Sequence, residues 1–145
     1  MAETISAGQD SPDPRDALIE RLARNPRLAH ATFFSHRHPD ETPRFHLEMI
    51  DAWHSPEPHV ITEAFRGGAK STVAEEAITV MALLRQFKNG VILGDNETRA
   101  KERLTSIKHE LETNEAIEEL FGSQVGDTWT ETKIVLKNGV ALHAI

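Results

Sequence analysis

Residues 65–72 read FRGGAKST and combine side chains that suit phosphate chemistry. Gly67 and Gly68 let the backbone approach a ligand closely, because they carry no Cβ. Lys70 supplies a point charge for the β and γ phosphates of a nucleotide, and the hydroxyl of Ser71 is a magnesium ligand. The chemistry that this stretch predicts is the binding of polyphosphate together with Mg²⁺.

The position of this stretch agrees with that chemistry. It follows a short apolar run, predicted as a strand over His59–Thr62, and precedes helical apolar spacing that starts at Val73. A helix that begins there directs unpaired N–H groups and the positive end of its dipole at the ligand. The generic phosphate loop has two glycines where this chain has Ala64 and Ala69, so a simple turn before a helix is the alternative interpretation.

Composition limits the class of protein. The chain has 145 residues, enough for one ordinary domain, and its 39% hydrophobic and 27% charged residues are typical of globular proteins. The net charge of −7 argues against a nonspecific nucleic-acid binder, and the absence of cysteine excludes disulfides and thiolate metal sites. The polar, acidic N-terminus does not resemble a secretory signal, so we expect a cytoplasmic protein.

The segment before the loop is predicted to be helical. Residues 1–13 read as a disordered lead-in, and residues 14–57 as a helical N-terminal segment. A first helix starts near Arg15, is interrupted at Pro26, and is followed by a second short helix. A further helix ends at Pro56 and Pro58 and has helical spacing of its apolar residues Phe45, Met49, Ile50 and Trp53.

The segment from 58 onward is predicted to be α/β. A helix over Lys70–Phe87, closed by Asn89 and Gly90, leads into an apolar strand over Gly90–Gly94. With the strand before the loop, these elements predict a βαβ unit whose helix lies on a sheet.

The remaining elements follow from caps and turns. Asp95 or Asn96 caps the next helix, and Asn114 caps a short helix that ends near Phe121. A strand over Trp129–Leu136, the turn pair Asn138-Gly139 and a return strand over Val140–Ile145 then predict a C-terminal β-hairpin. Asp95 also stands where it could face a nucleotide, although capping accounts for it.

Some polar and aromatic residues have two interpretations. Phe45 and His46 are candidates for packing near an adenine base, but the helical spacing of Phe45, Met49 and Trp53 is more typical of core residues. His36, His38 and His46 lack a carboxylate at a familiar ligand spacing, so packed or solvated histidines are favoured over a metal site. The run Glu110–Glu119 is predicted to be a solvated helix face.

Beyond these local patterns, RGGAKST after an apolar strand resembles the variant Walker A motif of phage terminase large subunits, which commonly read R-G-x-A-K-S-T. Other segments resemble the same family in the same order: HP followed by RFHLEMID, then VILGDNETRA, IKHELETNEAIEELFG and TW…KIVLKNGVALHA. The resemblance covers roughly Phe33–Ile145. It implies an incomplete P-loop NTPase core of the RecA-like (ASCE) type over residues 58–145, truncated before the Walker B strand.

The resemblance also implies an activity and partners. The family hydrolyses ATP to drive double-stranded DNA into a preformed capsid, and cuts that DNA with a C-terminal nuclease. It implies binding to double-stranded DNA, the portal protein and the small terminase subunit, a ring of identical subunits when full length, and no membrane. A phage or prophage protein of this kind acts in the cytoplasm of a bacterial host.

Residue roles carry over to the matching positions. Arg66 matches the arginine that stabilises charge on the transferring phosphoryl group, with a surface pair to Glu63 as the alternative. Lys70 would bind the β and γ phosphates, and Ser71, beside Thr72, would hold Mg²⁺. The expected ATP-binding residues are Gly67, Gly68, Ala69, Lys70, Ser71 and Thr72.

The catalytic acids of such an ATPase are not found in this sequence. They belong at the end of a later apolar strand, whereas the acids near the loop in sequence are Glu63 and Asp95. We therefore expect the chain alone to hydrolyse ATP poorly. The alternative is a nonhydrolysing module that contacts DNA or packaging partners through its N-terminal helices, where the sequence hints weakly at a basic face formed by Arg21, Arg24, Arg27 and Arg37.

Overall fold

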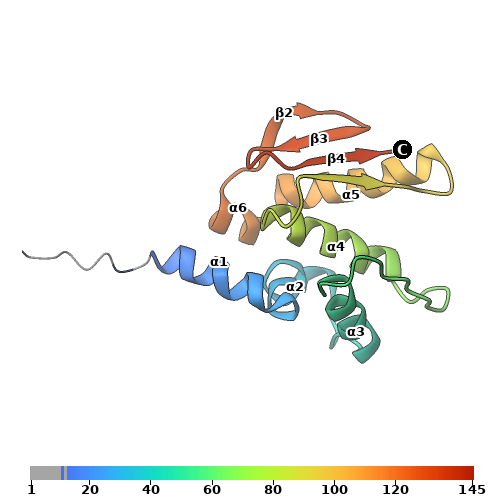
Figure 1. The fold of residues 1–145 in the computed structure, drawn as a ribbon, viewed down its shortest axis with the longest axis horizontal. Coiled ribbons are helices and arrows are strands. Elements are labelled where there is room, and N and C mark those ends of the chain that lie inside the picture. The colour runs from blue at the N-terminus through green and yellow to red at the C-terminus, as the bar shows by residue number, and fades with distance from the viewer. Residues whose placement is uncertain (1–10, 12) are drawn as a thin grey trace, which may run out of the picture.

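The computed structural model describes residue 11 and residues 13–145, so nearly all of the predicted lead-in lies outside the described residues. The described chain is mixed α/β, with six α-helices and an open four-stranded sheet, which confirms the predicted α/β class. In Figure 1 the sheet forms one layer, a long helix lies along one face of it, and the N-terminal helices form the opposite side of the molecule. None of the described helices is long and apolar enough to cross a membrane.

The N-terminal helices start where the sequence predicts. Helix α1 (Pro14–Arg24) and helix α2 (Pro26–Phe34) each have proline at the first helical position, where the missing N–H costs nothing. Asn25 lies between them, and its side chain accepts a hydrogen bond from the N–H of Leu28 at 3.1 Å. A 3₁₀ turn, η1 (Ser35–Arg37), follows, and then helix α3 (Arg44–Trp53). The predicted break at Pro26 is confirmed.

Helix α4 (Lys70–Leu83) starts at the predicted residue but ends one turn before Phe87. The reason is a local backbone motif: Arg85 adopts the left-handed conformation with φ of 54°, and the N–H of Gln86 donates to the carbonyl of Met81 at 2.9 Å. This arrangement is a helix-ending motif in which arginine replaces the usual glycine. The predicted closure by Asn89 and Gly90 is therefore wrong.

The sheet contains strands β1 (Asn89–Ile92), β2 (Val125–Trp129), β3 (Lys133–Leu136) and β4 (Ala141–Ala144), in the order β1-β4-β3-β2. Strand β1 pairs with β4 in parallel, and the other pairs are antiparallel. The hairpin of β3 and β4 is confirmed. The single predicted strand over Trp129–Leu136 is wrong, because the chain bends between β2 and β3 and β2 begins four residues earlier.

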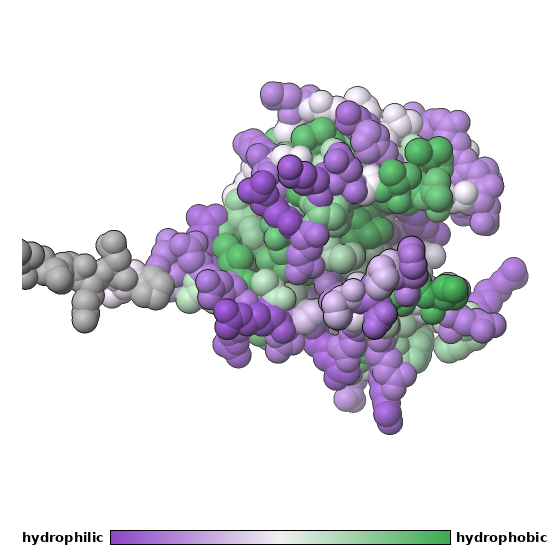
Figure 2. Space-filling model, in the orientation of Figure 1, coloured by the Kyte–Doolittle hydropathy of each residue, from purple (hydrophilic) through white to green (hydrophobic). Residues whose placement is uncertain are grey.

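The predicted strand over His59–Thr62 is also wrong. These residues are irregular and pair with no described strand, and the side chain of Ile61 is 97% exposed. A strand needs the backbone of a neighbour, and the edge of β1 away from β4 has no described partner. Leu93, the residue after β1, is 75% exposed. Figure 2 shows hydrophobic surface on the part of the molecule that the sheet forms. Only the helix and the second strand of the predicted βαβ unit form.

Helix α5 (Glu97–Thr113) connects the sheet to the rest of the core, and helix α6 (Glu115–Phe121) continues from it. Asn96 and Asn114 cap these two helices, as predicted, by accepting backbone N–H groups. Helix α5 packs against β4 and β1 on one side and α4 on the other. Helix α4 therefore lies mainly among helices α2, α3 and α5, and not on the sheet as predicted.

Candidate phosphate-binding site

The loop before α4 reverses its direction with two left-handed residues. Gly67 has φ of 87° and Ala69 has φ of 53°, while the N–H of Gly68 donates to the carbonyl of Phe65 at 3.2 Å. Glycine adopts this conformation freely, but alanine does so at a cost of about 1–2 kcal/mol. The chain accepts this strain at the residue immediately before the helix, and strained backbone of this kind is concentrated at functional sites.

The first turn of α4 directs its N–H groups into the space beside the loop. The helix begins at Lys70, no side chain caps it, and the first intrahelical bond runs from the N–H of Val73 to the carbonyl of Ala69 at 3.0 Å. The N–H groups of the residues in between therefore have no partner within the helix. Together with the helix dipole, they favour an anion at this point.

The loop and the start of α4 enclose an open cavity of about 660 Å³. Its volume suits a nucleotide-sized ligand. Asp95 from the end of β1 and Arg103 from α5 complete its wall. The structure brings all the residues predicted for the site together around it: Arg66, Gly67, Gly68, Ala69, Lys70, Ser71 and Thr72.

The charged side chains of the predicted site are available to a ligand. Within the described part of the chain, neither Arg66 nor Lys70 has a carboxylate partner within 4 Å, so the alternative pair of Arg66 with Glu63 does not form. Arg66 and Ser71 are exposed, and Lys70 is half-buried. A polyphosphate could therefore contact both cations without breaking an existing ion pair.

Oxygen ligands for a magnesium ion are present in the same cavity. Asn96, and not Asp95, caps α5, so the carboxylate of Asp95 is exposed at the cavity wall near Ser71. No group of three or more His, Asp or Glu residues in the described chain is arranged to hold a metal alone. Mg²⁺ usually takes one or two protein oxygens and completes its shell with phosphate and water, and the residues here fit that mode.

His46 supports the loop from behind, a role that sequence reasoning missed. Its ring is 6% exposed, and its Nε2–H donates to the carbonyl of Gly68 at 2.8 Å. The ring of Phe45 lies against both His46 and Phe65, with centroids 4.4 and 5.3 Å away. Neither Phe45 nor His46 lines the cavity. They hold the loop in place, and this favours the packing interpretation over contact with a base.

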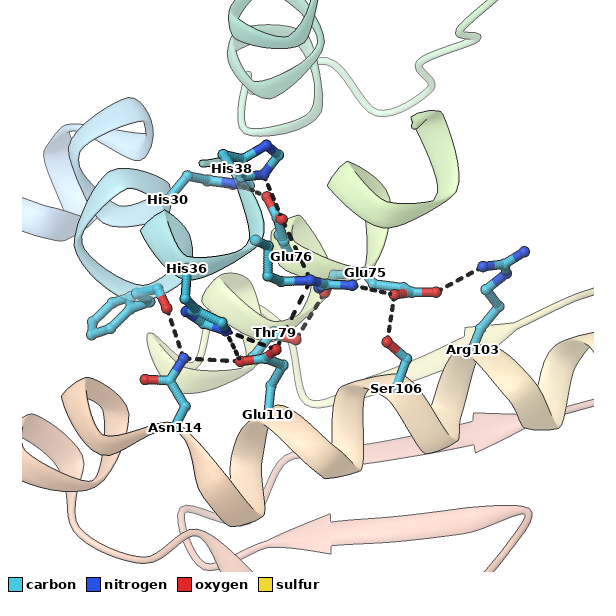
Figure 3. Close-up of polar contacts among 12 residues, drawn as sticks. His30, His36, His38, Glu75, Glu76, Thr79, Arg103, Ser106, Glu110 and Asn114 are labelled. Carbon is cyan, nitrogen blue, oxygen red and sulfur yellow. Dashed lines mark hydrogen bonds and ion pairs between the residues drawn. The ribbon is translucent and has the colours of Figure 1, made fainter. Parts of the chain in front are cut away.

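A buried polar network lies beside the site and was also missed (Figure 3). Glu75 and Glu76 of α4 are 4% and 1% exposed, and Glu110 of α5 is 7% exposed. The run Glu110–Glu119 was predicted to be a solvated helix face, and this prediction is wrong at Glu110. The Nε2 atom of His38 lies 2.7 Å from Glu76, and that of His36 lies 3.1 Å from Glu110. The sequence signal for this network was the pair of adjacent glutamates, Glu75 and Glu76, inside an otherwise apolar helix.

The network joins the N-terminal helices to the core. Arg37 of η1 donates to Glu75 at 3.1 Å, and His30 of α2 lies 3.3 Å from Glu76. From the other side, Asn114 donates to the carbonyl of Phe33 at 2.7 Å. The sequence predicted packed or solvated histidines, and both kinds occur: His46 is 6% exposed, and the side chain of His36 is 54% exposed. These contacts fix α2 and α5 against the helix that carries the loop.

One histidine makes stability depend on pH. Burial, with a contribution from nearby His30, lowers the pKa of His54 to about 4 from its usual 6.5. Between these values the unfolded chain binds a proton that the folded chain does not, so stability is lost as the pH falls from about 6.5 to 4. Solvent screening at this partly exposed ring limits the loss to about 1–2 kcal/mol.

The test is urea unfolding at pH 7 and pH 4.5. We expect His54→Gln to lose less stability than the unmodified chain over this interval, because glutamine does not titrate. Thr113→Gln is the matched control, since Thr113 is exposed on α5 and does not titrate. Equal pH slopes for all three proteins would contradict the prediction.

Comparison with known proteins adds no assignment to this geometry. The sequence matches no protein-family model, and no curated protein is significantly similar to it. The chemistry of the loop and its cavity therefore carries the functional conclusion.

Proposed function

We propose that this chain binds ATP with Mg²⁺ at residues 66–72, as the ATP-binding part of a P-loop NTPase. The observation that carries the proposal is the loop itself: left-handed Gly67 and Ala69 lead directly into an uncapped helix that begins at Lys70. Free backbone N–H groups, a free lysine and a helix dipole meet in one cavity, and each of them favours phosphate.

Each residue then has a role set by its chemistry. Lys70 binds the β and γ phosphates as a point charge, while the planar fork of Arg66 contacts the transferring phosphoryl group. The hydroxyl of Ser71, with Thr72 beside it, is the protein ligand for Mg²⁺, and Asp95 offers a carboxylate in the same cavity. When bound, Mg²⁺ neutralises phosphate charge. His46 keeps the carbonyl of Gly68 turned away from the ligand.

The sequence resemblance extends the proposal to a biological class. We propose a terminase large subunit, whose ATPase drives double-stranded DNA into a capsid and works with a portal protein and a small subunit in a bacterial cytoplasm. The match of RGGAKST to the variant Walker A motif supports this, because Ala69 before Lys70 is expected in that variant. Ala69 directly precedes Lys70, as glycine does in the generic loop, and its left-handed φ of 53° is a conformation that glycine adopts freely.

A DNA-binding role for the N-terminal helices has less support. Of the arginines that hinted at a basic face, Arg27 donates to Asp51 at 2.9 Å, Arg37 is turned into the buried network, and Arg24 lies 3.9 Å from Glu20. Their charge is largely neutralised within the chain. The phosphate cavity is therefore the better-supported site.

The test is calorimetric titration with ATP in the presence of Mg²⁺. We expect Lys70→Ala to weaken ATP binding by roughly 10- to 100-fold, because that is the affinity usually lost when a charge-assisted hydrogen bond to phosphate is removed. Lys137→Ala is the matched control, because Lys137 is exposed and lies outside the cavity. Failure of the unmodified chain to bind ATP would refute the function, and equal binding by Lys70→Ala would refute the site.

A further inference from the structure

We propose that Arg103 of α5 is a third phosphate-binding cation beside Lys70 and Arg66: its side chain moves away from Glu75 and contacts the terminal phosphate of bound ATP. This inference rests on the proposed function. Arg103 lies far from the loop in sequence, yet it lines the same cavity as Lys70 and Ser71. It is thus positioned to make the site respond to the γ-phosphate.

The distance that Arg103 must cover is short. Its Nη1 atom donates to Oε1 of Glu75 at 3.0 Å, and Glu75 follows Ser71 by four residues on α4. Residues four apart lie on the same helix face, about 5–6 Å from each other. Arg103 thus contacts a residue one helical turn after Ser71 and lines the same cavity as that serine, so a change of rotamer is enough to turn its guanidinium toward the proposed phosphate.

Glu75 can release Arg103 without losing its charge compensation. Its other oxygen, Oε2, accepts from Arg37 at 3.1 Å and from the hydroxyl of Ser106 at 2.7 Å (Figure 3). After the release, Arg37 keeps one cation beside Glu75 and Ser106 keeps its hydrogen bond to Oε2, while Oε1 gives up its contact with Arg103. The two arginines differ in freedom, because the side chain of Arg103 is 39% exposed and that of Arg37 only 18%. Arg103 is therefore the cation that can move.

Phosphate is the better partner for the released guanidinium. A terminal phosphate carries more charge than a carboxylate that is already shared, and it accepts two parallel hydrogen bonds from the arginine fork. ADP lacks the γ-phosphate and so gives Arg103 less to reach.

The test compares ATP and ADP affinities by calorimetry in the presence of Mg²⁺. We expect Arg103→Gln to reduce the preference for ATP over ADP about tenfold, or about 1.4 kcal/mol. Arg103→Lys should restore part of that preference, since it keeps the charge without the fork. Arg99→Gln is the matched control, because Arg99 lies one turn earlier on α5 and pairs with the exposed Glu102.

The outcomes separate this inference from the proposed function. If Lys70→Ala loses ATP binding but Arg103→Gln keeps the full ATP preference, the function stands and the role of Arg103 is refuted. An equal loss of ATP and ADP affinity in Arg103→Gln also refutes it, because that is the result of a purely structural role. If the unmodified chain binds neither nucleotide, both proposals fall. If Arg103→Gln does not fold, Arg103→Lys provides the test. A preference for ATP over ADP equal to that of the unmodified chain would then refute the role of Arg103.

Discussion

Replacing Arg37 with alanine is expected to lower the free energy of unfolding by roughly 3 kcal/mol. The guanidinium donates to Glu75 at 3.1 Å and lies 3.9 Å from both Glu76 and Glu110. All three carboxylates are buried, so the loss of this cation leaves negative charge that water cannot reach. Arg103 remains paired with Glu75 alone, so it compensates only part of this charge. Urea unfolding monitored by circular dichroism measures the effect.

Two further variants test whether the loss of stability comes from uncompensated buried charge. Arg24→Ala removes an exposed pair with Glu20, whose side chains are 83% and 74% exposed, and should cost well under 1 kcal/mol. Arg37→Lys keeps the charge but cannot contact several carboxylates at once. We therefore expect its stability to lie between that of Arg37→Ala and that of the unmodified chain. If Arg37→Ala is no more harmful than Arg24→Ala, the network does not hold the N-terminal helices to the core.

Replacing Phe33 with alanine is expected to cost about 3–5 kcal/mol, the usual range for a buried phenylalanine. Phe33 is 1% exposed, and its ring lies 5.8 Å, centroid to centroid, from that of Phe121 on α6. Truncation would leave a cavity between α2 and α6, where the neighbouring helices are also fixed by Asn114. Thermal and urea unfolding both report this loss.

Phe65→Ala is the control of the same residue type. Phe65 is 66% exposed at the edge of the phosphate loop, where its truncation removes little buried area. We expect its stability to stay within about 1 kcal/mol of the unmodified chain. Similar losses for Phe33→Ala and Phe65→Ala would contradict the structural role of the buried contact between Phe33 and α6.

Local signals predicted most helices and the loop. Pro26, Asn96 and Asn114 set helix starts through interactions within a few residues, so a single sequence is enough to locate them. The same is true of the turn at Asn138-Gly139. The helix that begins at Lys70 and the cavity-lining residues 66–72 follow from the spacing in FRGGAKST.

Features that depend on distant partners could not be predicted. The run His59–Thr62 has strand composition, but strand formation needs a paired neighbour, and none is described beside it. Glu75 looks like a surface residue until Arg37 and Arg103, from segments on either side in sequence, are brought against it. Arg103 belongs to the site only because α5 folds back toward the loop.

The free edge of β1 also affects how the chain behaves at high concentration. Val91 is 56% exposed beside an unpaired strand edge, and the side chains of Leu93 and Ile145 are 75% and 62% exposed nearby. An apolar strand edge without charge or proline is a template for pairing with another chain. We therefore expect edge-to-edge self-association at this surface when the concentration is high, and a lysine on the edge of β1 away from β4 should reduce it.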